Sequence, residues 1–299
     1  MSRTQDLYLA AAAAIALWWT ISLQMSVRSF VQEVTTFKLF VYQSHTYMKE
    51  VLSSFENTSH LEDESRPHFS FSHTERKLVS EFSQEDENLI QYIKHNLLIP
   101  PPMYVGLDWG FDRSRGILPA VMNYLKNMKG GFHVECCAFE GHYSQAHFLE
   151  THHHWEGLVI EEEPSKLAQL IKMKRNVSIL PTCVSPEKKP VQMMLNLRPD
   201  GSSKMSDNGT LLQCMPLFSV LKAAGKSTID FFSFYNEGRE LEILKTLPFD
   251  KVNIKAIAVY RAQKNKDVSE TLKTFMYGKG FYNVNITLED YVFLRNENL

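Results

Sequence analysis

The distribution of apolar and polar residues divides the chain into three zones. The first is Leu7–Val27, a run of 21 residues without a formal charge. A bilayer core of about 30 Å takes roughly 20 apolar helical residues, so this run is long enough to cross it. We therefore predict a signal-anchor transmembrane helix over residues 1–28. Two alternatives stay open: a signal peptide cleaved at the weak site Thr20–Ser22, and a buried helix.

The second zone is a polar segment that follows the predicted anchor. Residues 29–85 show no clear period, and from Ser53 onward they are rich in Ser, Glu and His. Such a composition is typical of a stalk or linker. Helical spacing of apolar residues resumes at Glu87–Ile93, ahead of Pro100–Pro102. We therefore place one folded domain at residues 86–299.

Short apolar runs alternate with amphipathic segments in this third zone. The predicted strands are His133–Cys137, Gly157–Glu162, Val177–Val184, Ile229–Tyr235 and Ile254–Val259, and the predicted helices are Ser165–Arg175, Leu217–Ala224, Glu237–Thr246 and Val268–Tyr277. Alternation of this kind predicts βαβ units. The expected fold class is α/β, a doubly wound Rossmann-like and mainly parallel sheet. Its ligand site should lie at the carboxyl ends of the first strands.

Charge and sequons narrow the class of protein. The chain has 32 basic and 34 acidic residues, a net charge of −2, so it lacks the basic excess of nucleic-acid-binding proteins and we expect no nucleic-acid partner. The sequons at Asn57, Asn176, Asn208 and Asn285 all follow the predicted anchor. They favour a type II topology, with glycosylation of a domain that lies in the secretory lumen or outside the cell.

The cysteines and histidines do not show the spacing of a metal site. Cys136 and Cys137 are adjacent on a predicted strand, so their side chains point to opposite faces. Cys183 and Cys214 are candidate disulfide partners in an oxidising lumen, with unbonded buried thiols as the alternative. Five histidines lie between positions 142 and 154, and because no HExxH motif is present we predict a solvated cluster and no metal.

Three segments fall where a doubly wound fold would hold a nucleotide-like ligand. His133–Gly141 runs from the first strand into a loop, Gly157–Glu161 is a strand that ends in an acid, and Asp230–Glu240 runs from a later strand into a helix. An acid at the end of the second strand can accept both ribose hydroxyls of an adenosine. A capped loop or a solvated strand end is the equally weighted structural reading of Glu135 and Glu161.

The order and spacing of five stretches resemble the FkbM-type methyltransferase family over roughly residues 87–299. The stretches are Leu89–Pro101, Trp155–Glu161, Pro181–Ser185, Gln213–Leu217 and Asp230–Glu240. Together with the predicted anchor and stalk, they are most similar to the membrane-anchored subset of the family that includes the insect protein Star. The resemblance implies a Rossmann-like fold that binds S-adenosylmethionine (SAM).

The family's SAM loop has the form (D/E)-x-G-A-x-(D/N)-G. The resemblance assigns Glu135, Ala138 and Gly141 to matching positions, with Glu140 as a substitute. Cys137 replaces the first glycine. Because that glycine lets the backbone approach the ligand without a Cβ clash, a cysteine there weakens the expected site.

The family's later motif has the form L-D-x-E-G-x-E. Glu237, Gly238 and Glu240 match it, but Tyr235 stands at the position of the aspartate, and Arg239 replaces a residue that is typically small. Loss of the aspartate removes a plausible general base or polar anchor.

The resemblance with its departures implies a non-catalytic domain that keeps the fold. No catalytic residue is assigned, no cofactor is expected unless the domain is an active methyltransferase that uses SAM, and Glu135, Ala138, Glu140, Gly141 and Glu161 form a vestigial or weak SAM site. The alternative is an active SAM-dependent O-methyltransferase. Resemblance to the Star-like subset implies a single-pass membrane protein of the endoplasmic reticulum, Golgi and endosomes that sorts a protein cargo or receptor ligand.

Overall fold

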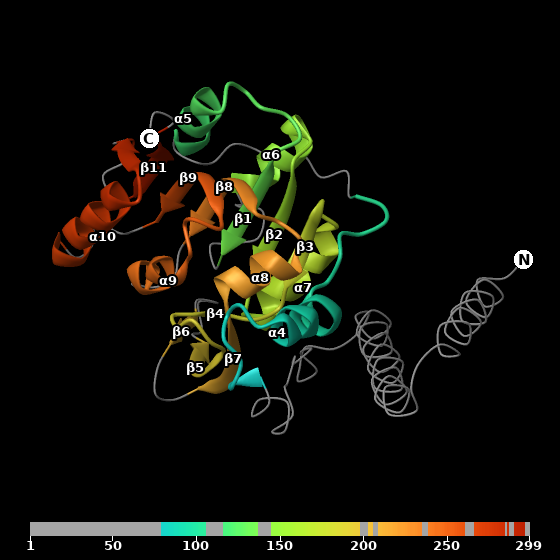
Figure 1. Ribbon diagram of the computed structural model, residues 1–299. Helices are drawn as coiled ribbons and strands as arrows, with labels where there is room; N and C mark the ends of the chain where they lie inside the picture. Colours follow the sequence, from blue (N-terminus) through green and yellow to red (C-terminus); the bar gives the residue numbers. More distant parts are fainter. Residues whose placement is uncertain are drawn as a thin grey trace, which may run out of the picture. The chain divides into compact units, whose positions relative to one another are not determined.

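A seven-stranded sheet organises the part of the chain that the structure describes (Figure 1). The computed structural model describes residues 79–105, 116–136, 145–197, 203–205, 209–234, 239–260, 266–284, 286 and 290–296. The predicted anchor at residues 7–27 and most of the predicted stalk lie outside these ranges. Among the helices within them, none combines the length and the apolar character needed to cross a membrane.

The main sheet has the order β10-β11-β9-β8-β1-β2-β3. Its strands are β1 (Phe132–Cys136), β2 (Glu156–Ile160), β3 (Val177–Leu180), β8 (Thr228–Phe234), β9 (Asn253–Val259), β10 (Phe281–Val284) and β11 (Tyr291–Arg295). The strands from β3 to β9 in this order are parallel, whereas β11 runs antiparallel to both β9 and β10. The predicted mainly parallel α/β sheet is therefore confirmed.

The helices cover both faces of this sheet. They are α4 (Glu87–Tyr92), which continues into the π-helical turn η1 (Ile93–Leu97), α5 (Ile117–Tyr124), α6 (Gln145–His153), α7 (Pro164–Met173), α8 (Leu217–Ala223), α9 (Glu240–Thr246) and α10 (Lys266–Gly278). Helices α4, α8, α9 and α10 share one core cluster, and α5, α6 and α7 contribute to clusters on the other face. This two-sided packing is the doubly wound arrangement.

Strand β1 shows how the sequence serves both layers. Val134 and Cys136 belong to the core on the α8 side. Since side chains alternate along a strand, His133 and Glu135 point to the opposite face, toward α6 and α7. Phe231, Phe232 and Phe234 of β8 are fully buried, as expected of core residues. The central strands therefore read as nearly continuous apolar runs, interrupted on one face by charge.

One predicted strand is shorter than expected. The stretch Val177–Val184 stops at Leu180 as β3, because Pro181 has no N–H with which to continue a ladder. The chain then enters a second sheet of order β4-β7-β5-β6. Its strands are β4 (Val184–Ser185), β5 (Val191–Leu197), β6 (Ser203–Met205) and β7 (Thr210–Pro216).

The folded region begins earlier than residue 86. Val79 is fully buried in the main core. The backbone N–H of Gln84 donates to Lys188 O at 2.7 Å, and its side-chain amide donates to Thr246 O at 3.1 Å. Asp86 then caps α4 by accepting a hydrogen bond from the N–H of Asn88. The end of the predicted stalk is therefore part of the domain.

A bridge between Ile99 and Ile179 covers the β3 edge. Each residue donates its N–H to the carbonyl of the other at 2.8 Å. Pro100–Pro102 follow directly in the sequence.

Candidate ligand site at the carboxyl edge of the sheet

The order of the strands reverses beside β1. Strands β2 and β3 extend the sheet to one side of β1, and β8 and β9 extend it to the other. In open α/β sheets, ligands bind outside the carboxyl ends of the strands at such a switch point. Two described residues flank it: Glu161 directly follows β2, and Arg239 follows β8 after a short interval.

Part of the predicted site lies outside the described residues. This holds for Cys137, Ala138, Glu140 and Gly141 of the first loop, and for Tyr235 of the later motif. Their roles stay predictions.

Glu161 is held in place by the turn that leads into α7. Its Oε1 accepts a hydrogen bond from the N–H of Glu163 at 2.9 Å, and Glu163 in turn accepts one from the N–H of Lys166 at 2.8 Å. Pro164 begins the helix, a position where its missing N–H costs nothing. A local sequence of cap and proline thus fixes the carboxylate at the end of β2.

The second oxygen of Glu161 is buried and accepts no hydrogen bond from any residue that the structure describes. The residue is 2% exposed, and among the described residues no donor lies within hydrogen-bond distance of Oε2. Burial, together with the charge of Glu162, raises the pKa of the Glu161 carboxyl well above its ordinary value. A buried acceptor left without a donor is costly, so this atom can gain from a hydroxyl that a ligand supplies.

Glu135 takes part in a buried network of ion pairs instead of standing alone. Its Oε2 lies 3.2 Å from Nη2 of Arg175, and the same nitrogen lies 2.5 Å from Oε1 of Glu150. His133 approaches Glu150 through Nε2 at 2.9 Å. These four side chains come from β1, α6 and the segment after α7, and we call them the β1 charge cluster.

The β1 charge cluster holds the Glu150 carboxylate ionised despite its complete burial. Burial alone would raise the pKa of Glu150, but the charge of Arg175 and the hydrogen bond from His133 outweigh it and lower the pKa to about 2. For Arg175 burial acts in the lowering direction, and the two carboxylates raise the pKa above its ordinary value. Since a carboxylate can only accept, His133 donates to Glu150 from Nε2–H.

Gly157 makes room for the cluster on the neighbouring strand. A Cβ at this position would lie 2.1 Å from Nε2 of His133. A side chain here would displace the imidazole from Glu150, so glycine is required for close approach and not for turn geometry.

Arg175 contradicts one sequence interpretation. The run Lys172–Arg175 suggests a solvated helix end, and Lys172 and Lys174 are indeed exposed. Arg175, however, lies beyond the end of α7 and is only 2% exposed. Its partners Glu135 and Glu150 are 40 and 25 residues away in the sequence, so no local pattern could have identified them.

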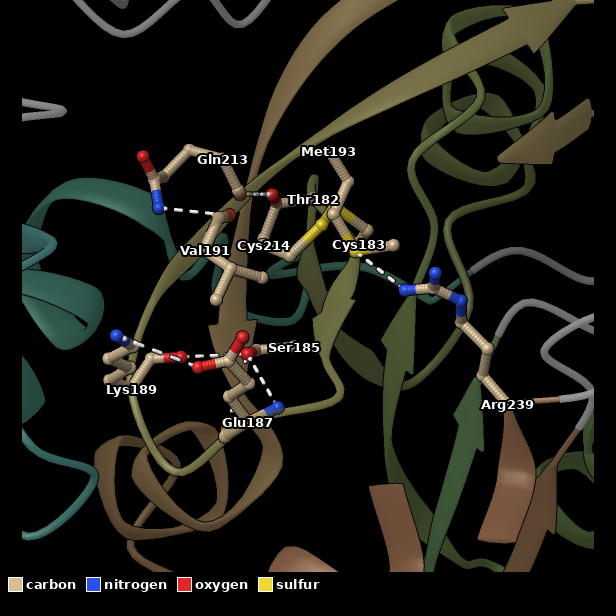
Figure 2. Close-up of a disulfide and its surroundings, with 10 residues drawn as sticks. All are labelled: Thr182, Cys183, Ser185, Glu187, Lys189, Val191, Met193, Gln213, Cys214 and Arg239. Atoms are coloured by element: carbon tan, nitrogen blue, oxygen red, sulfur yellow. Dashed lines mark hydrogen bonds and ion pairs between the residues drawn. A yellow bond between two sulfur atoms is a disulfide. The ribbon is translucent and has the colours of Figure 1, made fainter. Parts of the chain in front are cut away.

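A disulfide joins the residue before β4 to the neighbouring strand β7 of the second sheet. Cys183, which follows β3, is bonded to Cys214 of β7 across a sequence separation of 31. Beside it, the hydroxyl of Thr182 donates to the carbonyl of Gln213, and the amide of Gln213 donates to Val191 O at 3.1 Å (Figure 2). The bond therefore closes the loop that contains β4, β5 and β6.

Arg239 reaches toward this disulfide from the carboxyl side of β8. Figure 2 shows its guanidinium directed at Met193 of β5, whose sulfur lies 3.5 Å from Nη1. The apolar face of the second sheet and the ligand edge of the main sheet thus meet at Arg239.

The remaining predicted residues are placed as follows. The Nδ2 group of Asn176 donates to Trp155 O at 3.1 Å, and the residue is partly buried. Asn57, Asn208 and Asn285 lie outside the described residues. Among the predicted histidine cluster, His152 and His154 are exposed, but His147 is 5% exposed and so is not solvated as expected. Within the described ranges, no three potential metal ligands converge.

Strand order and direction define the class of fold. A parallel sheet that carries a reversed strand, β11, between β9 and the edge strand β10 is a Rossmann-like sheet of the methyltransferase-like type. The methyltransferase-like fold implied by the sequence is thus supported.

The comparisons with known proteins add little to this class. The solved structures that show low similarity to this chain include the following two. The fibrillarin pre-rRNA processing protein of Methanococcus jannaschii has 14% identity and a TM-score of 0.30, over 56% of this chain and 67% of that one. The METTL16 MTase domain has 11% identity and a TM-score of 0.37, over 86% of this chain and 92% of that one. Similarity at this level carries no conclusion about function. No family model and no curated protein matches the chain.

Proposed function

We propose that this protein is a membrane-anchored protein of the secretory and endosomal pathway whose methyltransferase-like domain binds SAM, or its demethylated product, without efficient methyl transfer. The domain would belong to the FkbM-type family and its Star-like subset. In this role it presents a ligand-stabilised surface to a protein cargo or receptor ligand.

The unpaired oxygen of Glu161 is the observation that carries the proposal. It lies at the end of β2, is buried, and has no donor among the described residues. A ribose carries two adjacent hydroxyls, and an acid at the end of the second strand of a Rossmann-like sheet is suited to accept from them. Glu135 is less suited to this role because its carboxylate is paired with Arg175.

Two sequence features argue against turnover. Cys137 replaces a glycine of the loop after β1, and Tyr235 replaces an acid after β8. The Cys137 side chain would narrow the space through which the backbone approaches the ligand, and the change to Tyr235 removes a candidate general base. Weak binding without transfer is the function that fits an intact Glu161 beside these changes.

The disulfide supports the proposed compartment. Disulfides persist in the secretory pathway and are rare in the cytosol. Cys183 and Cys214 are buried and bonded, which fits a domain that faces the lumen behind the predicted anchor.

Calorimetric titration of the full-length protein with SAM and S-adenosylhomocysteine tests the binding. We expect dissociation constants of tens to hundreds of micromolar and no methyl transfer to added acceptors. Glu161→Gln should weaken binding by about tenfold, because a charged acceptor contributes roughly 1.5–3 kcal/mol to a hydrogen bond. The matched control is Glu156→Gln at the other, exposed end of β2.

The outcomes separate the candidate functions. Absence of binding by the unchanged protein would refute the proposal. Binding that is accompanied by turnover would replace it with the active O-methyltransferase. If Glu161→Gln and the unchanged protein bind SAM with equal affinity, Glu161 does not contribute to ligand binding.

A further inference from the structure

Arg239 is a partly buried cation that pairs with no carboxylate in the described part of the chain. Its one hydrogen-bond acceptor in the described part of the chain is the sulfur of Met193, at 3.5 Å. A thioether is a weak acceptor, whereas a guanidinium carries five donors in a fixed fork. A cation removed from water costs free energy unless an anion pairs with it. The guanidinium therefore has unused capacity for an anion.

The surface that Arg239 contacts is apolar. Residues directly opposite each other in antiparallel strands share a face, and the pairs Val191 with Cys214 and Met193 with Leu212 place these four side chains on one face of the β5–β7 ladder. Val191, Met193 and Leu212 are partly exposed. We call these three residues, together with the disulfide, the hairpin face.

The disulfide fixes the hairpin face against the main sheet. Cys183 lies three residues after the end of β3, an edge strand of the main sheet, and is bonded to Cys214 of the hairpin face. Thr182 adds a hydrogen bond to Gln213. The apolar surface is thus held in position near Arg239, as the close-up shows (Figure 2).

We propose that Arg239 and the hairpin face form a second binding site for a small organic anion with an apolar group. Its carboxylate would pair with the guanidinium, since the planar fork of arginine matches a carboxylate in a bidentate manner. Its apolar portion would pack on Met193 and Leu212. The site lies on the β8 side of the switch point, whereas Glu161 lies on the β2 side.

This second site goes beyond SAM binding and does not depend on it. The charge of Arg239 selects an anion, and the half-exposed apolar surface beside it favours a ligand that is more than a bare inorganic ion. A neutral apolar molecule would use only the hairpin face, and a bare anion only the guanidinium.

Ligand-observed NMR titration of the full-length protein with three small probes tests the proposal. Benzoate carries both the charge and the ring, benzamide carries the ring without the charge, and acetate carries the charge without the ring. We expect benzoate to bind about tenfold more tightly than either, because a charge-assisted hydrogen bond contributes about a factor of ten or more.

The variants assign the two contributions. Arg239→Gln should remove the preference for benzoate over benzamide, and Arg239→Lys should keep part of it. Met193→Ala should weaken both aromatic probes and leave their ratio unchanged. Lys189→Gln is the control, because it removes an exposed cation that lies two residues before β5 and outside the hairpin face.

Two results would overturn the second site. One is equal binding of benzoate and benzamide to the unchanged protein, a measurement that needs no variant to fold. The other is an unaltered benzoate affinity in Arg239→Gln. SAM titration of the same samples is a separate measurement, so absence of benzoate binding and absence of SAM binding can be told apart.

Discussion

Arg175 contributes more to the fold than its sequence neighbourhood indicates. It follows three exposed or partly exposed residues of a basic segment, yet it supplies the permanent positive charge of the β1 charge cluster. Two carboxylates on different elements depend on it. Sequence alone identified Glu135 and Glu161 as candidate site residues, but not that Arg175 pairs with the first and leaves the second available.

Replacing Arg175 by methionine should destabilise the domain strongly. Removing one partner of a buried ion pair leaves uncompensated charge, which costs about 3–5 kcal/mol. Urea unfolding followed by circular dichroism measures the change. The comparison variant is Lys189→Met, whose ion pair with Glu187 is more than half exposed, and there we expect at most about 1 kcal/mol. Equal stability of the two variants would contradict the importance of the cluster.

Glu161 should make ligand binding dependent on pH. Burial and Glu162 raise its pKa, so below that pKa the carboxyl is protonated in the unliganded protein. Hydroxyl donors favour the ionised form, and binding therefore releases a proton in the range between the ordinary and the raised pKa. Affinity for S-adenosylhomocysteine should increase as pH rises through this range. Calorimetry in buffers of different ionisation enthalpy detects the proton, and a flat profile that Glu161→Gln reproduces would exclude this coupling.

At the scale of elements, the local pattern of apolar and polar residues predicted the parallel strands, because that pattern is what determines them. The five parallel strands were found with ends that differ by one to a few residues, because each is a short apolar run between polar turns. The second sheet was missed. Its strand β5 (Val191–Leu197) contains Gln192 and Asn196 between apolar residues, so its apolar pattern is weak. Its pairing with β7 depends on contacts between residues that are far apart in the sequence, and a single sequence does not reveal those contacts.

The disulfide Cys183–Cys214 is the covalent restraint on the segment that contains β4, β5 and β6. In the chain-entropy account, closing a loop of about 30 residues stabilises the folded state by about 3–4 kcal/mol. Cys183→Ser with Cys214→Ser should lower the free energy of unfolding by that order. It should also weaken benzoate binding, because the hairpin face loses its fixed position. Thermal unfolding with and without reductant measures the first effect, and an unchanged midpoint for the double variant would contradict it.

At the scale of the whole molecule, the sequence predicted the sheet but not its far edge. Strand β11 follows β10 with no helix between them and runs antiparallel to both β9 and β10, so a search for βαβ units does not include it. Cys137 and Tyr235 lie outside the described residues, and their effects on SAM binding stay predictions from the resemblance.

The topology of the whole chain can be tested by glycosylation. If the predicted anchor places the domain in the lumen, endoglycosidase treatment of the protein from a eukaryotic cell should increase its gel mobility. Asn57→Gln should remove part of the shift, because this sequon lies in the predicted stalk. Asn176→Gln should matter less, since the side chain is partly buried and donates to Trp155 O. An unchanged mobility of the untreated and treated protein would argue against the lumenal topology.

The bridge at Ile99 has a consequence for self-association. Exposed strand edges offer unpaired N–H and C=O groups to other molecules, and long edges lead to aggregation. On the β3 side, Ile99 of the same chain covers this edge by bridging to Ile179 of β3. The three prolines that follow Ile99 have no N–H with which to bind a strand of another molecule. Among the described strands, β10 is the edge at the opposite end. The main sheet is therefore one-sided with respect to edge-to-edge pairing. Two copies could pair through β10, but the prolines beside β3 oppose the second open edge that a continuous fibre of main sheets needs.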